Sequence, residues 1–158
     1  MLILIQHLPE WVPQFLVAAL QTLELTAASF VIALLGLGIA AYLTVEHYSA
    51  SATLACPETG AINCTKVTTS SWSHVGPVPV AVLGLVFFTA MAILCGPPAW
   101  RLRVLDPLRV AGAGVGVASA LYLIWAELFR IDAICLWCTA VHVCTLLLLG
   151  CVMWATSA

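Results

Sequence analysis

Charged side chains are scarce in this sequence. Only 8% of its 158 residues are Asp, Glu, Lys or Arg, whereas soluble globular domains contain about 25%. Hydrophobic residues make up 63% of the chain, and the mean hydropathy is +1.12. This composition excludes an ordinary soluble domain and predicts a protein that lies in the lipid bilayer.

Basic residues are also few. The chain has five Lys and Arg against seven Asp and Glu, which gives a formal net charge of −2. Nucleic-acid binding depends on clustered Lys and Arg that neutralise phosphates. We therefore expect no nucleic-acid partner.

Long apolar runs account for most of the chain. A membrane-spanning helix needs roughly 20 predominantly apolar residues. Four segments approach or reach that length, at residues 25–45, 78–95, 110–126 and 134–155. They predict an all-α membrane protein whose single domain, residues 1–158, is a bundle of four transmembrane helices.

Two more polar regions flank the first apolar run. Before it, Glu10, Gln14, Gln21 and Glu24 recur near one face of a helix, which predicts an N-terminal helix lying at the membrane interface. After it, residues 46–77 are rich in Ser, Thr, Gly and Pro and form the one long loop. We expect a short helix on the membrane surface within this loop, over residues 65–72.

The arginines suggest an orientation in the membrane. Three of the five basic residues, Arg101, Arg103 and Arg109, lie between the second and third apolar runs. The positive-inside rule assigns this connection to the cytoplasm. The 46–77 loop and the start of the last span then face the extracytoplasmic side, where disulfides form and persist.

Four of the seven cysteines form two pairs with short spacing. Cys56 and Cys64 lie in the long loop, and Cys135 and Cys138 form a Cys-Leu-Trp-Cys motif at the start of the last span. Residues i and i+3 share a helix face, and a helix N-terminus stabilises a thiolate. Because thiol exchange proceeds through mixed disulfides, two pairs on one membrane face can act as a relay.

Other interpretations of the cysteines stay open. Cys-x-x-Cys motifs also hold zinc, although no histidine lies near the loop pair in a ligand pattern, and a metal or heme carrier is one alternative. A second alternative is a structural protein in which a Cys56–Cys64 disulfide only braces the outer loop. Cys95, Cys144 and Cys151 are expected to be small buried hydrophobic residues.

His142 is a polar residue within the last apolar run. It follows Cys138 by one helical turn and lies on the same stripe as Cys135. Ionisable residues at membrane depth usually face the interior of a helix bundle or a cavity. We expect His142 either to donate to a ligand oxygen or to form a hydrogen bond between helices.

Two further patterns have simple structural interpretations. Gly112, Gly114 and Gly116 resemble part of a dinucleotide-binding motif, but no strand precedes them, so we expect these small residues to let helices approach closely. Glu127 and Arg130, three residues apart near a helix end, are expected to form an ion pair at the membrane rim.

Three segments together resemble the vitamin K epoxide reductase family in its bacterial form. They are the loop Cys56-Pro-Glu-Thr-Gly-Ala-Ile-Asn-Cys64, the segment Thr69-Ser70-Ser71-Trp72, and the motif Cys135-Leu-Trp-Cys138. The resemblance extends from about residue 25 to the C-terminus. The disulfide-bond protein B family also combines four helices, four cysteines and a quinone, but it carries its Cys-x-x-Cys motif in the first outer loop.

The resemblance implies a membrane enzyme that generates disulfides with a thioredoxin-like partner. No thioredoxin-like domain is fused within the 158 residues, so the partner is expected to be a separate chain. By position in the motif, Cys56 would react with the partner's dithiol, Cys64 would exchange with Cys135, and Cys138 would face the quinone. Ser70 would be the family's loop serine that orients reactive groups.

The resemblance also suggests where a quinone binds. His142 occupies a position where many members have a tyrosine that binds the quinone carbonyl, and Phe87, Phe88 and Trp137 are candidate walls of an apolar pocket. Val80 aligns with an asparagine that vertebrate members use for the quinone head. A plain quinone, ubiquinone or menaquinone, is therefore the expected electron acceptor, without a metal. The expected location is the bacterial cytoplasmic membrane.

Overall fold

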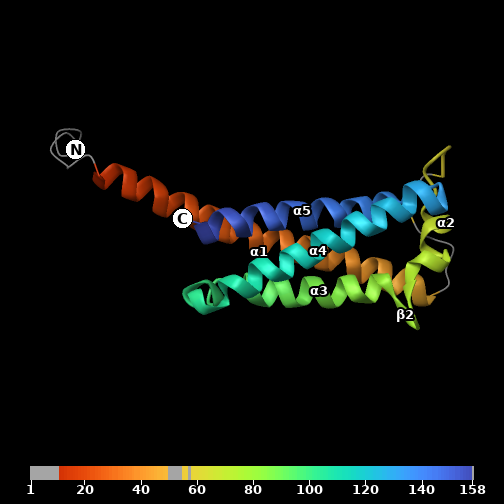
Figure 1. The fold of residues 1–158 in the computed structure, drawn as a ribbon, viewed down its shortest axis with the longest axis horizontal. Helices are drawn as coiled ribbons and strands as arrows, with labels where there is room; N and C mark the ends of the chain where they lie inside the picture. The colour runs from red at the N-terminus through yellow and green to blue at the C-terminus, as the bar shows by residue number, and fades with distance from the viewer. Residues whose placement is uncertain (1–10, 50–54, 57, 158) are drawn as a thin grey trace.

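The computed structural model describes residues 11–49, 55–56 and 58–157. Four long helices lie side by side and make up most of this part (Figure 1). They are α1 (Trp11–Ser49), α3 (Val80–Leu94), α4 (Asp106–Ala126) and α5 (Leu136–Ser157). Helix α1 contacts α3 and α5, and α4 contacts α5 and α3.

Three of the helices are long and apolar enough to cross a membrane. These segments are Leu20–Ser49, Arg103–Ile131 and Leu136–Ser157. The fourth helix, α3 (Val80–Leu94), is apolar but shorter, because Val78 and Pro79 form a strand rather than the first helical turn expected there. The protein is thus a mostly helical membrane protein, and a fourth membrane span remains a prediction.

Residues 11–24, the described part of the expected interfacial helix, do not form a separate helix. Helix α1 runs without a break from Trp11 to Ser49, so residues 11–24 of the expected interfacial helix continue directly into the first span. Residues 1–10, Glu10 among them, lie outside the described residues. The position of this segment at the membrane interface remains a prediction.

The long loop folds into short elements at one end of the bundle. Helix α2 (Cys64–Thr68) is followed by a 3-10 turn (Ser71–Ser73), so the short helix expected over residues 65–72 is present in two pieces. Strands β1 (His74–Val75) and β2 (Val78–Pro79) then form a small antiparallel hairpin. Gly76 turns this hairpin with φ of +61°, a value that glycine adopts without steric cost.

Aromatic rings and glycines bring the helices together in the core. Phe88 is fully buried, and its ring lies against Gly36, where an added Cβ would be only 2.1 Å from the ring. Phe87 contacts Gly116 of α4 in the same way. The bundle depends on these close contacts, which a larger residue at either glycine would obstruct.

The opposite end of the bundle carries the arginine-bearing turn between α3 and α4 (Figure 1). Arg109 is not a loop residue, because it lies within α4 and is fully buried. Its Nε donates to the Leu94 carbonyl at 2.8 Å, its guanidinium pairs with Asp106, and it lies 4.3 Å from the Trp100 ring. Arg109 therefore fixes this turn and adds little to the surface charge on which the orientation was predicted.

Candidate active site

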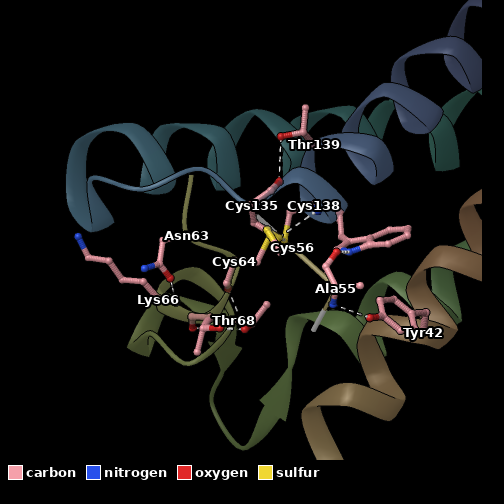
Figure 2. The surroundings of a disulfide bond; sticks show 12 residues. Tyr42, Ala55, Cys56, Asn63, Cys64, Lys66, Thr68, Cys135, Cys138 and Thr139 are labelled. Carbon is pink, nitrogen blue, oxygen red and sulfur yellow. Dashed lines mark hydrogen bonds between the residues drawn. A yellow bond between two sulfur atoms is a disulfide. The ribbon is translucent and has the colours of Figure 1, made fainter. Parts of the chain in front are cut away.

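The two cysteine pairs meet at the end of the bundle that carries α2. Cys56 and Cys64 form a disulfide, and Figure 2 shows the side chains of both pairs directed toward one another. Cys64 and Cys135 are fully buried in one apolar cluster, against which Cys56 and Cys138 pack. Two motifs distant in sequence are thus adjacent in space.

Main-chain hydrogen bonds hold the cysteine loop against the start of α5. Ile62 and Ile134 form a parallel β-bridge. The Ile134 N–H donates to the Ala61 carbonyl at 2.8 Å, and the Asn63 N–H donates to the Ile134 carbonyl at 3.1 Å. Because Asn63 precedes Cys64 and Ile134 precedes Cys135, this bridge sets the two cysteines side by side.

A tight turn and a helix cap direct Cys64 inward. Gly60 adopts φ of +58° in a turn that Thr59 and Ile62 close with two reciprocal main-chain hydrogen bonds of 3.1 and 3.0 Å. The side chain of Asn63 then accepts a hydrogen bond from the Lys66 N–H at 2.7 Å and starts α2 at Cys64. Asparagine is among the preferred residues for this capping role.

Cys135 has a similar capping position at the start of α5. Its sulfur accepts hydrogen bonds from the Cys138 N–H at 3.2 Å and from the Cys138 thiol at 2.7 Å. The hydrogen bond from the Cys138 thiol lowers the pKa of Cys135. Cys135 is thus the sulfur of this pair that ionises first, and a thiolate is the nucleophile in disulfide exchange.

Two basic side chains on the outside of the site, Lys66 and Arg130, also hold the loop in place. Lys66 donates through Nζ to the Asp132 carbonyl at 3.2 Å. The Arg130 guanidinium lies 5.4 Å from the Trp72 ring and 5.6 Å from the Trp125 ring. The expected ion pair between Arg130 and Glu127 is wrong for the described residues, since Arg130 contacts these rings instead.

The geometry agrees with the sequence comparison. The sequence model of the Vitamin K epoxide reductase family matches residues 27–153, which is most of the chain. The chain belongs to this family. Membership makes it an integral membrane oxidoreductase of the vitamin K epoxide reductase kind, a class that exchanges thiols and disulfides and acts on quinones. No curated protein matches the chain.

A groove between the end of α4 and the first half of α5 contains His142, the residue that was predicted to bind a quinone. It has a volume of about 250 Å³ and apolar walls, with three polar side chains, those of Glu127, Thr139 and His142. His142 is 5% exposed, and its ring forms no hydrogen bond with any residue that the structure describes. An apolar groove with few polar groups suits a quinone ring.

The other predicted quinone contacts do not line this groove. Phe87 and Phe88 fill the bundle core against glycines, and Val80 is the first residue of α3. The ring of Trp137 packs 4.9 Å from that of Tyr42. These four residues could contact a quinone only if the quinone ring binds elsewhere in the bundle. Their predicted role therefore remains untested.

Ser70 lies in the loop, and its hydroxyl forms no hydrogen bond with a cysteine among the described residues. Its hydroxyl donates to the Val67 carbonyl at 2.8 Å, and its own carbonyl accepts from the Ser73 hydroxyl at 2.7 Å. It joins α2 to the following 3-10 turn. A direct role in the reaction remains a prediction.

Sequence reasoning missed two residues at this site. Tyr42 of α1 accepts a hydrogen bond from the Ala55 N–H at 3.2 Å, next to Cys56, and no sequence pattern pointed to this contact. Glu127 is 6% exposed and faces the groove. An acidic residue within an apolar span was the available signal for Glu127. Among the described residues, no group of three or more His, Cys, Asp or Glu is arranged to hold a metal.

Proposed function

We propose that the protein is a thiol:quinone oxidoreductase that oxidises a separate thioredoxin-like protein and reduces ubiquinone or menaquinone. The observation that carries this proposal is the burial of Cys64 and Cys135 in one cluster, aligned by the Ile62–Ile134 bridge. A loop disulfide that only braced a surface would not need the second pair beside it.

The first exchange takes place at the loop disulfide. A thiolate of the partner attacks Cys56, which is less buried than Cys64, and the Cys56–Cys64 bond breaks as a mixed disulfide forms. The partner's second thiol then attacks this mixed disulfide and releases Cys56. The partner leaves oxidised, and the loop pair carries its two electrons as thiols.

The second exchange passes the electrons into the bundle. The Cys64 thiolate attacks Cys135 of an oxidised Cys135–Cys138 pair and releases Cys138 as a thiolate. Cys56 then attacks Cys64, which restores the loop disulfide and leaves Cys135 and Cys138 reduced. This stage, with the loop disulfide formed and Cys135 and Cys138 as thiols, precedes the reduction of the quinone.

The groove lined by His142 is the site that best suits the quinone. A quinone takes up two electrons and two protons when it is reduced. The His142 ring, without another hydrogen-bond partner in the described part of the chain, would bind its carbonyl oxygen. Cys138 precedes His142 by one turn of α5, so the dithiol lies beside the groove.

In the membrane, we propose that all four long helices span the bilayer with the cysteine end on the extracytoplasmic side. The loop and the start of α5 share one end of the bundle (Figure 1), and an oxidising compartment suits that end. The bacterial cytoplasmic membrane has such a face.

Replacing the final thiol tests the relay. In Cys138→Ala, Cys135 can still attack Cys64 and displace Cys56, but the Cys138 thiol that would attack Cys135 and release Cys64 is missing. Mass spectrometry should therefore find a Cys64–Cys135 disulfide with Cys56 free, and quinone reduction should fall to background. Cys151→Ala, which removes a free cysteine from the same helix, is the matched control and should behave as wild type.

The same variant can contradict the proposal. If Cys138→Ala contains only the Cys56–Cys64 disulfide and reduces quinone at the wild-type rate, the two pairs do not form a relay. If Cys135→Ser also leaves the cellular function intact, the chain is better described as a structural protein with a braced outer loop.

A further inference from the structure

Glu127 lines the groove that lies near the start of α5. It begins a π-helical turn, Glu127–Ile131, at the end of α4. The Ala133 N–H donates to the Glu127 main-chain carbonyl at 3.2 Å, and Ile134, which precedes Cys135, lines the same groove as the Glu127 side chain. The carboxyl group therefore lies near the start of α5, where the two cysteines are.

The surroundings of Glu127 leave its charge without compensation. The side chain is 6% exposed, and within the described residues it forms no ion pair. Arg130, the nearest basic residue in sequence, lies over the Trp72 and Trp125 rings instead. An unpaired buried carboxylate is costly, so such a group tends to hold a proton.

Glu127 also shares the groove with His142. Both line the same cavity, and His142 is 5% exposed. The third polar side chain there, Thr139, already donates its hydroxyl to the Cys135 carbonyl at 2.9 Å. Glu127 is thus the acidic group in the groove that can give a proton to a ligand bound at His142.

We propose that Glu127 is the proton-transfer residue between the Cys135–Cys138 dithiol and the quinone oxygen. This inference rests on the proposed function. In the reduced enzyme, Cys135 and Glu127 share one proton, because two adjacent anions repel each other, and the proton resides on Glu127 while Cys135 is a thiolate. Glu127 gives this proton to the quinone oxygen as the Cys135–Cys138 bond forms and the electron pair leaves the sulfurs.

The remaining proton completes the balance. The Cys138 thiol releases it as the disulfide forms, and it reaches the other quinone oxygen through water. The dithiol and Glu127 together thus lose two electrons and two protons, which equals the uptake by the quinone. When Cys64 next attacks Cys135 and Cys56 then attacks Cys64, the Cys135 thiolate is released, and Cys138 and Glu127 each take up a proton from water.

Infrared difference spectroscopy tests the protonation of Glu127 without any quinone. The full-length protein in detergent is reduced with dithiothreitol and then oxidised chemically. The wild type should lose the band of a protonated carboxyl group on oxidation. Glu127→Gln, which keeps the size of the side chain but cannot ionise, should lack this change. An equal carboxyl band in both redox states of the wild type would overturn the proposal.

Kinetics with a short-chain ubiquinone provides the second readout. Glu127→Gln should reduce the quinone about 100-fold more slowly, at the lower end of the range for general acid–base catalysis. Its KM should stay within about twofold, and the Cys64–Cys135 exchange should keep its rate. Glu127→Asp, which retains a carboxyl group, should recover part of the activity. A wild-type rate in Glu127→Gln would overturn the proposal even if the protein folds normally.

These outcomes separate the two proposals. A wild-type protein that reduces no quinone refutes the proposed function, whatever the infrared spectra show. A wild-type protein that reduces quinone, with Glu127→Gln equally active, refutes only the role of Glu127. If Glu127→Gln does not fold, Glu127→Asp serves for both measurements, and an unchanged carboxyl band on oxidation again contradicts the proposal.

Discussion

Replacing Gly116 with alanine should separate α4 from its neighbours. A Cβ at this position would lie 2.4 Å from Cζ of Phe87, 2.8 Å from its Cε2 and 3.0 Å from Cγ2 of Thr145. Carbon atoms in contact normally lie about 3.5–4.0 Å apart. The Phe87 ring would therefore have to shift by about 1 Å or more, and it is confined between helices.

The expected loss of stability follows from this overpacking. Forcing an extra methyl group into a packed core costs about 1–3 kcal/mol, so Gly116→Ala should lose stability in that range. Gly114 is the matched control, because an added Cβ there meets nothing within 4 Å. Gly114→Ala should be neutral or gain up to about 1 kcal/mol from its better helix propensity.

Unfolding in mixed detergent micelles can measure both variants against the wild type. Shrinking the ring with Phe87→Leu should restore part of the stability of Gly116→Ala, and a double-mutant cycle should show the coupling between these two positions. Equal stability of Gly116→Ala and Gly114→Ala would refute the reasoning. So would independent effects of Gly116→Ala and Phe87→Leu.

Two further predictions concern the two ends of the bundle. In the reduced protein, Cys138→Ala should raise the pH at which Cys135 ionises, because the hydrogen bond that lowers the pKa of Cys135 is lost. A pH titration that follows the ultraviolet absorbance of the thiolate measures this midpoint. An unchanged or lower midpoint would contradict the prediction. Arg109→Met should destabilise the protein by about 3 kcal/mol, because Asp106 and two main-chain carbonyls lose a buried partner. Unfolding in detergent measures this loss of stability, and Arg101→Met, at an exposed arginine, is the control. Equal stability of the two variants would contradict the prediction.

The sequence predicted the parts of the fold that depend on local patterns. Apolar runs located the four long helices, and the spacing of Cys135 and Cys138 predicted a reactive pair at a helix start. The contact between the loop and α5 depends instead on main-chain hydrogen bonds between Ile62 and Ile134. Main-chain pairing of this kind leaves no pattern in a single sequence, so only the family resemblance suggested that Cys64 and Cys135 meet.

Two predictions about charged residues were wrong: the ion pair between Glu127 and Arg130, and the position of Arg109 in a loop. Glu127 and Arg130 were paired because residues three apart share a face of an α-helix. The segment is a π-helical turn, whose wider winding rotates Arg130 away from Glu127 and toward Trp72. Arg109 was assigned to a loop because the apolar run begins at Val110, but helix α4 begins at Asp106 and includes Arg109.

In the proposed mechanism, burial determines the order in which the four sulfurs react. Cys64 and Cys135 are both fully buried, so a protein partner would not reach either of them without opening the loop, and Cys56 would be the sulfur through which electrons enter. The same burial keeps outside thiols away from the Cys64–Cys135 exchange. Cys138 continues the path toward the groove, where Glu127 and His142 lie. In this proposal, electrons and protons would leave the dithiol on the side of the groove, away from the surface at which the partner would bind.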